Sequence, residues 1–305
     1  MDRLAAGLSY IDLKFQRTPR IVATAVLQGP GGVALLDPGP ASTLGNLRQE
    51  LGDAGITIQD VSAIVLTHIH LDHAGATGTL LGENPRLKVY VHESGARHLV
   101  NPEKLLASAA RLYGDAMGEL WGEVRAVPPE AMATVAGGER IEAGGRDLLI
   151  QYTPGHASHH VSYFNEETGI AFVGDTAGIK RTFDGYVLPP TPPPDISPEL
   201  WNASLDKIEA WRPGTLFLTH FGPAGPPGAH IAEFRDNLAF AVDLVSASLR
   251  RDETDEARET WFTEQVRLEL RRRLAESDAH GYEVAGRFDL NWRGLARYLR
   301  KRDAS

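Results

Sequence analysis

The sequence predicts an α+β protein with a helical C-terminal extension, and three observations lead to this prediction. Short apolar runs typical of buried strands recur up to residue 218, and several end directly at His or Asp. Segments with apolar residues at helical spacing separate these runs. After Gly228, apolar residues recur every three or four positions. We therefore expect a main domain at residues 1–228 and a helical extension, packed on it, at residues 229–305.

The composition narrows the class of protein. An apolar content of 42% suffices for a large core, and the chain has no cysteine, which excludes disulfides and thiolate metal ligands. The sequence shows neither a signal peptide nor a run of about 18 apolar residues that would span a membrane. We therefore expect a cytoplasmic protein without a membrane partner. The net charge of −9 argues against nucleic acid as a partner.

The first half of the chain alternates between predicted strands and helices. Apolar runs predict strands at residues 9–15, 20–27, 33–36, 61–66 and 87–91. Helices are predicted at residues 42–54, 74–81, 93–100 and from residue 101 to residue 112 or beyond. Ser42 is the expected N-cap of the first helix, because Leu44, Leu47 and Leu51 follow it on one face.

The second half begins with strands and ends with helices. Strands are predicted at residues 146–152, 161–164, 170–173 and 215–218, with a helix from residue 197 to about 211. The proline-rich segment 180–198 fits neither a helix nor a central strand, and we expect it to be a stiff loop beside the strand ends. Its residues Lys180, Arg181, Phe183 and Tyr186 are candidates for substrate contact, although a solvated loop explains them equally well. Long helices are predicted from residue 229, at 254–275 and at 290–302.

Seven residues typical of metal ligands follow the ends of predicted strands. His68, His70, Asp72 and His73 lie in the stretch THIHLDHAG, directly after the apolar run 64–66. In extended backbone His68 and His70 point to the same side, because they are two positions apart. The other three, each beside a turn, are His156, Asp175 and His220. Imidazole and carboxylate bind zinc, iron or manganese, so the sequence predicts a metal site.

In this order the motifs HxHxDH, GH, GDT and TH resemble the metallo-β-lactamase-fold superfamily, and most closely its glyoxalase II-like branch. The resemblance covers most of residues 20–225. It implies a four-layered αββα sandwich with a two-metal site between the edges of the sheets, and hence a catalytic role for residues 1–228. It also implies that His160 supports the site without binding metal, whereas His159 stands where the branch usually has glycine.

The resemblance divides the seven residues between two metal ions. His68, His70 and His156 would hold the first ion, and Asp72, His73 and His220 the second, with Asp175 bridging both. We expect two zinc ions, with iron or manganese as alternatives. Such a pair holds a hydroxide that attacks the substrate, and Asp72 is the candidate that orients it or shuttles a proton.

The resemblance implies a hydrolase of a small-molecule thioester, lactone or related ester. One alternative is a sulfur (persulfide) dioxygenase that holds a single iron through His68, His156 and Asp175. A phosphodiesterase or nuclease of the same fold is disfavoured by the acidic balance of the chain. A binding protein without catalysis is disfavoured because all seven ligand positions are filled.

Two further features have competing interpretations. Asp37 is either a turn residue that bonds local backbone or a support for the metal site. Tyr113, Met117 and Trp121 lie four positions apart, which is typical of a core-facing helix stripe. The alternative is an apolar lid over the active site or the face of a homodimer.

Overall fold

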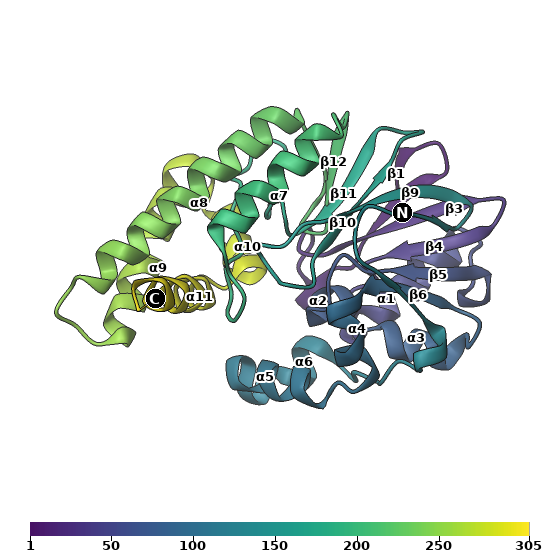
Figure 1. Ribbon diagram of the computed structural model, residues 1–305, viewed down its shortest axis with the longest axis horizontal. Coiled ribbons are helices and arrows are strands. Elements are labelled where there is room, and N and C mark those ends of the chain that lie inside the picture. The colour runs from purple at the N-terminus through teal and green to yellow at the C-terminus, as the bar shows by residue number, and fades with distance from the viewer. Residues whose placement is uncertain (305) are drawn as a thin grey trace.

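The computed structural model describes residues 1–304 and contains two β-sheets that face each other, with helices on both outer sides (Figure 1). The strands of the first sheet follow chain order. Its antiparallel part comprises β1 (Asp2–Ala5), β2 (Leu8–Asp12), β3 (Ala23–Gly29) and β4 (Gly32–Leu36). It continues in parallel through β5 (Val61–Val65), β6 (Lys88–His92) and β7 (Met132–Val135).

The second sheet has the order β13-β12-β11-β10-β9-β8 and is antiparallel except for the pair β11 and β12. Its strands are β8 (Arg140–Ala143), β9 (Arg146–Tyr152), β10 (Val161–Asn165), β11 (Ile170–Gly174), β12 (Thr215–Leu218) and β13 (Gly222–Ala224). The parallel connection from β11 to β12 contains the proline-rich segment and a helix. This arrangement brings the C-terminal ends of β9, β11 and β12 near the end of β5.

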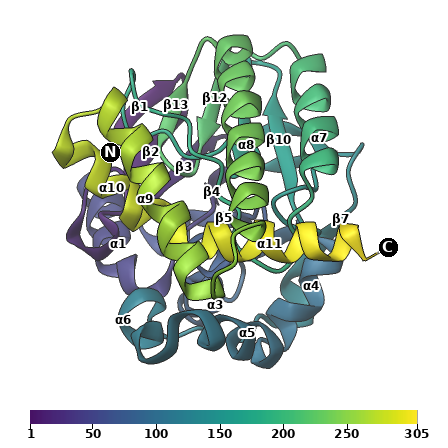
Figure 2. The same cartoon turned by 90° about the vertical axis from the view of Figure 1, so that its left-hand side faces the viewer.

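The helices form two outer groups (Figures 1 and 2). On the side of the first sheet are α1 (Leu44–Asp53), α2 (Leu71–Ala74), α3 (Thr77–Glu83), α4 (Glu93–Val100), α5 (Glu103–Tyr113) and α6 (Met117–Trp121). On the side of the second sheet are α7 (Pro198–Ala210), α8 (Pro227–Leu249), α9 (Asp255–Arg273), α10 (Glu276–Gly286) and α11 (Phe288–Asp303). Among these described helices, none combines the length and the apolar character needed to cross a bilayer.

Three apolar clusters separate four layers. The central cluster lies between the sheets, where Leu27 and Val65 of the first sheet pack with Ile150 and Phe172 of the second. One outer cluster joins the first sheet to α1, α3 and α4. The other joins the second sheet to α7 and to the C-terminal helices. The four-layered αββα sandwich and the helical C-terminal segment are therefore confirmed.

The C-terminal helices share a core with the second sheet. Phe234 of α8, Phe262 of α9 and Trp292 of α11 belong to the same buried cluster as Trp201 of α7. The indole N–H of Trp292 also donates to the Ser248 hydroxyl at 2.8 Å. Because burying such large aromatic side chains contributes several kcal/mol, these helices are fixed to the sandwich.

Several local predictions differ from the structure. Ser42 does not cap α1, because its hydroxyl donates to the carbonyl of Leu120 at 2.6 Å. The predicted strand 9–15 ends at Asp12, and Phe15 begins a short 3-10 turn. The sequence patterns did not predict β1, β7, β8, β13 and α10. The four strands have only three or four residues each, too few for a clear alternation pattern.

Gly155, next to the ligand candidate His156, lies against α7 and generates the first prediction. Its φ is 143°, and a Cβ atom there would lie 2.4 Å from the Cα of Trp201. We expect Gly155→Ala to destabilise the fold by about 1–3 kcal/mol through overpacking and backbone strain. Thermal unfolding measures this, with Gly52→Ala in α1 as the control, because a Cβ at Gly52 meets nothing within 4 Å. An unchanged melting temperature for Gly155→Ala would contradict the packing described.

Candidate metal centre

The seven ligand candidates meet at one end of both sheets. His68 and His70 lie in the loop after β5, and Asp72 and His73 lie in α2, which begins directly after that loop. The other three follow strands of the second sheet: His156 lies in the loop after β9, Asp175 after β11 and His220 after β12. Their side-chain atoms form three overlapping groups in which the candidate donor atoms lie within 4.8 Å of one another. Segments more than 150 residues apart in sequence therefore contribute to one cluster.

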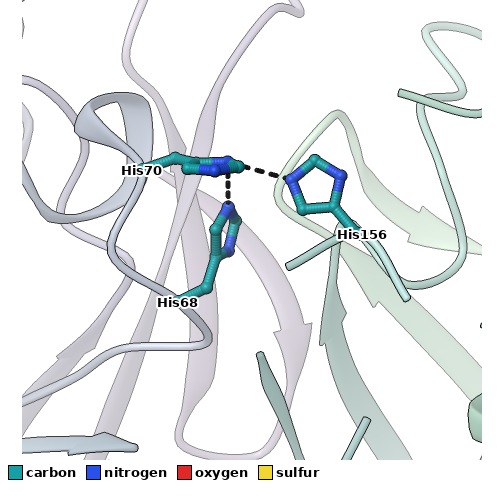
Figure 3. Close-up of side chains that lie close together, drawn as sticks. All are labelled: His68, His70 and His156. Atoms are coloured by element: carbon teal, nitrogen blue, oxygen red, sulfur yellow. Dashed lines mark hydrogen bonds between the residues drawn. The ribbon is translucent and has the colours of Figure 1, made fainter. Parts of the chain in front are cut away.

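His68, His70 and His156 form the first group (Figure 3). The Nδ1 of His70 lies 2.9 Å from the Nε2 of His68 and 2.9 Å from the Nε2 of His156. His70 thus presents Nδ1 and the other two present Nε2 to a common point. Such convergence of imidazole nitrogens suits a cation that accepts three nitrogen ligands.

Asp72, His73 and His220 form the second group, and Asp175 lies between the groups. The Nε2 of His220 lies 3.4 Å from Asp72 Oδ2 and 3.5 Å from Asp175 Oδ1. The other carboxylate oxygen of Asp175 lies 3.3 Å from the Nε2 of His156. Each oxygen of Asp175 therefore faces a different group, which is the arrangement that a bridging carboxylate needs.

Hydrogen bonds on the far side of the rings fix the tautomers. The Nδ1 of His156 donates to the Pro190 carbonyl at 2.9 Å, and that of His220 donates to the Ile21 carbonyl at 2.6 Å. The Nδ1 of His73 donates to the Asp37 carboxylate at 2.8 Å. A ring that donates from Nδ1 keeps a lone pair on Nε2 for a metal, and the acceptor also sets the ring orientation.

Asp37 is buried and hydrogen-bonds side chains of the cluster. This contact favours its interpretation as a support for the metal site over that as a turn residue. Its Oδ2 accepts hydrogen bonds from the hydroxyls of Thr67 and Thr219 at 2.7 and 2.8 Å, in addition to the one from His73. Its Oδ1 accepts from the backbone N–H of Thr67 at 2.8 Å. One carboxylate thus holds α2, the end of β5 and the end of β12 together.

His160 and His159 lie beside the cluster. The Nε2 of His160 accepts from the backbone N–H of Asp175 at 3.3 Å, and its Nδ1 lies 3.0 Å from the hydroxyl of Thr153. His160 therefore orients the loop that carries Asp175, which is the role that the resemblance implied. His159 lines the cleft described below, and its Nδ1 accepts from the N–H of Ile69 at 3.5 Å.

Burial keeps the first group neutral. It lowers the pKa of His68 well below the usual value, and neighbouring imidazoles, led by His73, add to the shift. Burial and the adjacent His156 lower the pKa of His70 to about 3. Burial also lowers the pKa of His156. These three imidazoles are therefore neutral at pH 7 and ready to bind a cation.

In the second group, histidine and aspartate side chains lie close enough to shift one another's pKa values. Burial alone would lower the pKa of His73, but the carboxylates of Asp175 and Asp37 hold it well above the usual value. Burial likewise opposes protonation of His220, and Asp175 nevertheless raises the pKa of this residue. Burial alone would raise the pKa of Asp72, but His73 and His220 hold it at about 2. Without a bound cation, the neighbouring carboxylates thus favour the protonated form of both imidazoles.

Two buried atoms of the cluster lack well-formed hydrogen bonds within the described residues, and a bound metal ion would provide a partner for them. The Nε2 of His73 and the Oδ1 of Asp175 are buried and lie 3.2 Å apart as an ion pair, but neither atom makes a hydrogen bond of normal geometry within the described chain. A buried polar atom without a partner is costly, and both atoms belong to groups that could hold a metal. The cluster of nitrogen and carboxylate donors without thiolate suits zinc, iron or manganese.

A cleft of about 420 Å³ opens over the cluster, and its wall includes His70, Asp72, His156, Asp175 and His220. This volume is typical of sites for small molecules. The side chain of Asp72 is 25% exposed, whereas that of Asp175 is 5% exposed. Asp72 is therefore the carboxylate of the cluster that a molecule in the cleft reaches most easily.

The four predicted substrate contacts do not line this cleft, and substrate contact by Lys180, Phe183 and Tyr186 stays a prediction. Arg181 is buried and donates to the carbonyls of the 19–20 segment and of Asp278, so its guanidinium is used structurally. Phe183 is 80% exposed. Lys180 and Tyr186 line a separate hollow of about 390 Å³, together with Phe183. Ile179 pairs with Leu188 as an isolated bridge, and the backbone N–H of Lys180 donates to the carbonyl of His220 at 2.6 Å.

Other residues form the cleft wall, and most were not predicted. Pro190 belongs to the proline-rich loop that the sequence indicated, but Phe15 and Val284 carried no recognisable signal. Tyr113 and Trp121 pack against the outer cluster of the first sheet and also line the cleft. These two residues therefore belong to the core and also line the cleft, while the lid and the homodimer face stay predictions.

Comparisons with known proteins agree with this geometry. The family model described as metallo-beta-lactamase superfamily matches residues 17–220. The metallo-beta-lactamase fold-containing protein ST1585 of Sulfurisphaera tokodaii is 29% identical over 211 residues, which are 68% of this chain and 76% of that protein. A metallo-beta-lactamase family protein of Thermus thermophilus has a solved structure that matches with a TM-score of 0.72 and 25% identity, covering 99% of this chain and 96% of that one.

Hydroxyacylglutathione hydrolases are also similar to the chain. The one from a Synechococcus strain is 28% identical over 178 residues, which are 57% of this chain and 52% of that enzyme. A second, from Legionella pneumophila strain Corby, is 27% identical over 52% of this chain and 48% of that enzyme. The chain thus spans about half the length of the hydroxyacylglutathione hydrolases that it matches.

The role of Asp37 generates a second prediction. Replacing Asp37 by Asn exchanges one carboxylate oxygen for an NH₂ group, which cannot accept a hydrogen bond. In either orientation of the amide the NH₂ group opposes present donors, either the backbone N–H of Thr67 or His73 and the two threonine hydroxyls. We expect zinc affinity to fall about 10- to 100-fold, as for other residues that hydrogen-bond metal ligands. Titration against a competing chelator measures this. Wild-type affinity in Asp37→Asn would show that the carboxylate is only a turn residue.

The protonated imidazoles generate a third prediction. A metal ion that binds His73 and His220 competes with protons, because the pKa values of both imidazoles are raised. We therefore expect zinc affinity to fall as the pH decreases and zinc binding to release protons at neutral pH. Calorimetric titrations in two buffers of different ionisation enthalpy count the released protons. Binding without proton release would contradict the assignment of charge.

Proposed function

The chain belongs to the metallo-beta-lactamase superfamily, and we propose that it is a metal-dependent hydrolase that cleaves a thioester, lactone or related ester at a dinuclear site. The observation that carries this proposal is the convergence of seven donor side chains in three overlapping groups at a cleft. The size of the cleft supports a small-molecule substrate. The likeness to hydroxyacylglutathione hydrolases supports an acyl compound as substrate.

The proposed ligands form two sets that share a carboxylate. His68, His70 and His156 would hold one ion, and Asp175 would contact both. Asp72, His73 and His220 would hold the second ion, as the three groups in the structure suggest. We propose zinc for both positions, although the same donors accept iron or manganese. When bound, such ions lower the pKa of a water molecule towards neutrality and polarise the substrate carbonyl.

Asp72 is the proposed catalytic residue among the ligands. Its carboxylate is the more exposed of the two in the cluster, and its pKa of about 2 keeps it ionised at neutral pH. An ionised carboxylate in this place accepts a hydrogen bond from the attacking water and so orients it. Because its pKa is so low, Asp72 is a weak base. We therefore propose that it orients the water molecule rather than holds its proton.

The two parts of the chain have different roles in this proposal. Residues 1–228 form the catalytic domain, since they supply all seven proposed ligands. Residues 229–305 form an extension that supplies part of the cleft wall through Val284, Ala285 and Leu290. The extension would therefore influence the choice of substrate without taking part in the bond cleavage.

The bridging carboxylate generates the fourth prediction. We expect Asp175→Ala to lose metal binding and hydrolysis together, because it removes one oxygen from each proposed metal position. Metal content and thioester hydrolysis are measured on the same preparation. Asp206→Ala is the control, because Asp206 is an exposed carboxylate of α7 that pairs with Arg235 at 2.7 Å. Retained turnover in Asp175→Ala would refute the proposed site.

A further inference from the structure

The cleft over the metal ligand candidates receives part of its wall from α5. Lys104, Ser108 and Leu112 line the cleft at a spacing of four residues, and Tyr113 follows them. They form one face of the helix. Lys104 and Tyr113 are about 13 Å apart along the helix axis at the usual rise. Leu105 and Ala109 of α5 line the cleft as well. The polar groups Lys104 and Ser108 lie in the N-terminal part of the face, and its C-terminal end is formed by Leu112 and Tyr113.

The apolar end is built from aromatic rings. Phe15 and Trp121 stack with their ring centroids 5.6 Å apart and an interplanar angle of 17°. Tyr113 meets Trp121 edge-on at 4.9 Å. All three line the cleft and belong to or pack against one buried cluster, so their positions are fixed. This end of the cleft therefore offers a rigid apolar surface to a ligand.

The C-terminal extension closes the apolar end from the other side. Val284 and Ala285 of α10 line the cleft and pack against the same cluster as Tyr113. Arg287 is the cation at this end, and it is already engaged: it pairs with Asp289 at 2.7 Å and lies 5.6 Å from the ring centre of Tyr113. The pair with Asp289 uses Nε and Nη2 of Arg287, so its charge is largely compensated within the chain.

The opposite end of the cleft is polar and open to water. Arg97 and Lys104, which line it, are exposed, and Ser158 is bonded to the exposed carboxylate of Asp195 at 2.6 Å. A polar part of a substrate can lie here without losing its hydration. The two ends thus differ in the kind of group that they accommodate.

We propose that the substrate is an ester or thioester with an extended apolar acyl chain that lies against Phe15, Tyr113 and Trp121. Its carbonyl lies over the metal ligand candidates and its alcohol or thiol part lies towards the polar end. This inference rests on the proposed hydrolase function and specifies the acyl group. Burying each methylene of the chain in the apolar end removes it from water and contributes to binding.

A short, hydroxylated acyl group fits this cleft poorly. It would leave the aromatic end filled with water and would gain nothing from Val284 and Ala285. Its hydroxyl would also find few partners there, since the wall at that end consists mainly of aromatic and aliphatic side chains. The architecture therefore separates this chain from a hydrolase that selects small polar acyl groups.

The test is a series of thioesters that share N-acetylcysteamine as the thiol and range from acetyl to decanoyl. We expect kcat/KM of the zinc-loaded enzyme to rise about fourfold per methylene until the chain fills the apolar end. The gain is expected mainly as a lower KM, because the contacts lie away from the reacting carbonyl. Higher kcat/KM for acetyl or lactoyl than for octanoyl thioester would overturn the proposal.

Two variants of α5 identify the surface involved. Leu112 lines the cleft, whereas Leu106 is an equally half-buried leucine of the same helix that packs on the core outside the cleft wall. We expect Leu112→Ser to flatten the dependence on chain length and Leu106→Ser to leave it as in the wild type. Equal slopes for Leu112→Ser and the wild type would place the chain elsewhere and overturn the assignment.

A binding measurement keeps this inference separate from the hydrolase proposal. If the zinc-loaded protein hydrolyses no thioester, lactone or ester of any length, the proposed function fails. Calorimetric titration with alkyl carboxylates from butanoate to decanoate still tests the apolar end. We expect the affinity to rise about fourfold per methylene, and an affinity independent of chain length would overturn the inference whatever the activity.

Discussion

The structure depends on one buried carboxylate, that of Asp37 at the end of β4. A fully buried ion must receive hydrogen bonds from its surroundings, and Asp37 receives them from Thr67, His73 and Thr219. These donors belong to the end of β5, to α2 and to the end of β12. The carboxylate therefore ties the two sheets together at the edge where the candidate metal ligands meet, and the same contact orients the ring of His73.

The charges of the cluster depend on where its histidines lie relative to the buried carboxylates. Burial lowers the pKa values of His68 and His70, whereas the adjacent carboxylates raise those of His73 and His220. The cluster thus combines ready ligands with ion pairs that a cation would replace. Above it, the cleft receives one wall from α5 and α6 and another from α10, so elements outside the ligand motifs shape the space for the substrate.

The sequence predicted the sandwich and the positions of the seven ligand candidates, because each motif follows a recognisable strand and a turn. It failed where a role depends on a distant partner. Arg181 looked available for a substrate, yet its backbone N–H bonds the hydroxyl of Tyr282, about 100 residues later, and its guanidinium is buried. The helix α10 itself was missed, since the stretch from Glu276 to Gly286 contains two glycines and no clear apolar stripe.

The most direct test of the account is the metal content of protein expressed without added metal, determined by elemental analysis. About two zinc ions per chain, lost on replacing Asp175, are expected if the seven side chains form a dinuclear site. About one iron per chain would contradict the dinuclear hydrolase and favour oxygen chemistry at His68, His156 and Asp175. A chain that retained no metal under any loading condition would contradict the metal centre itself.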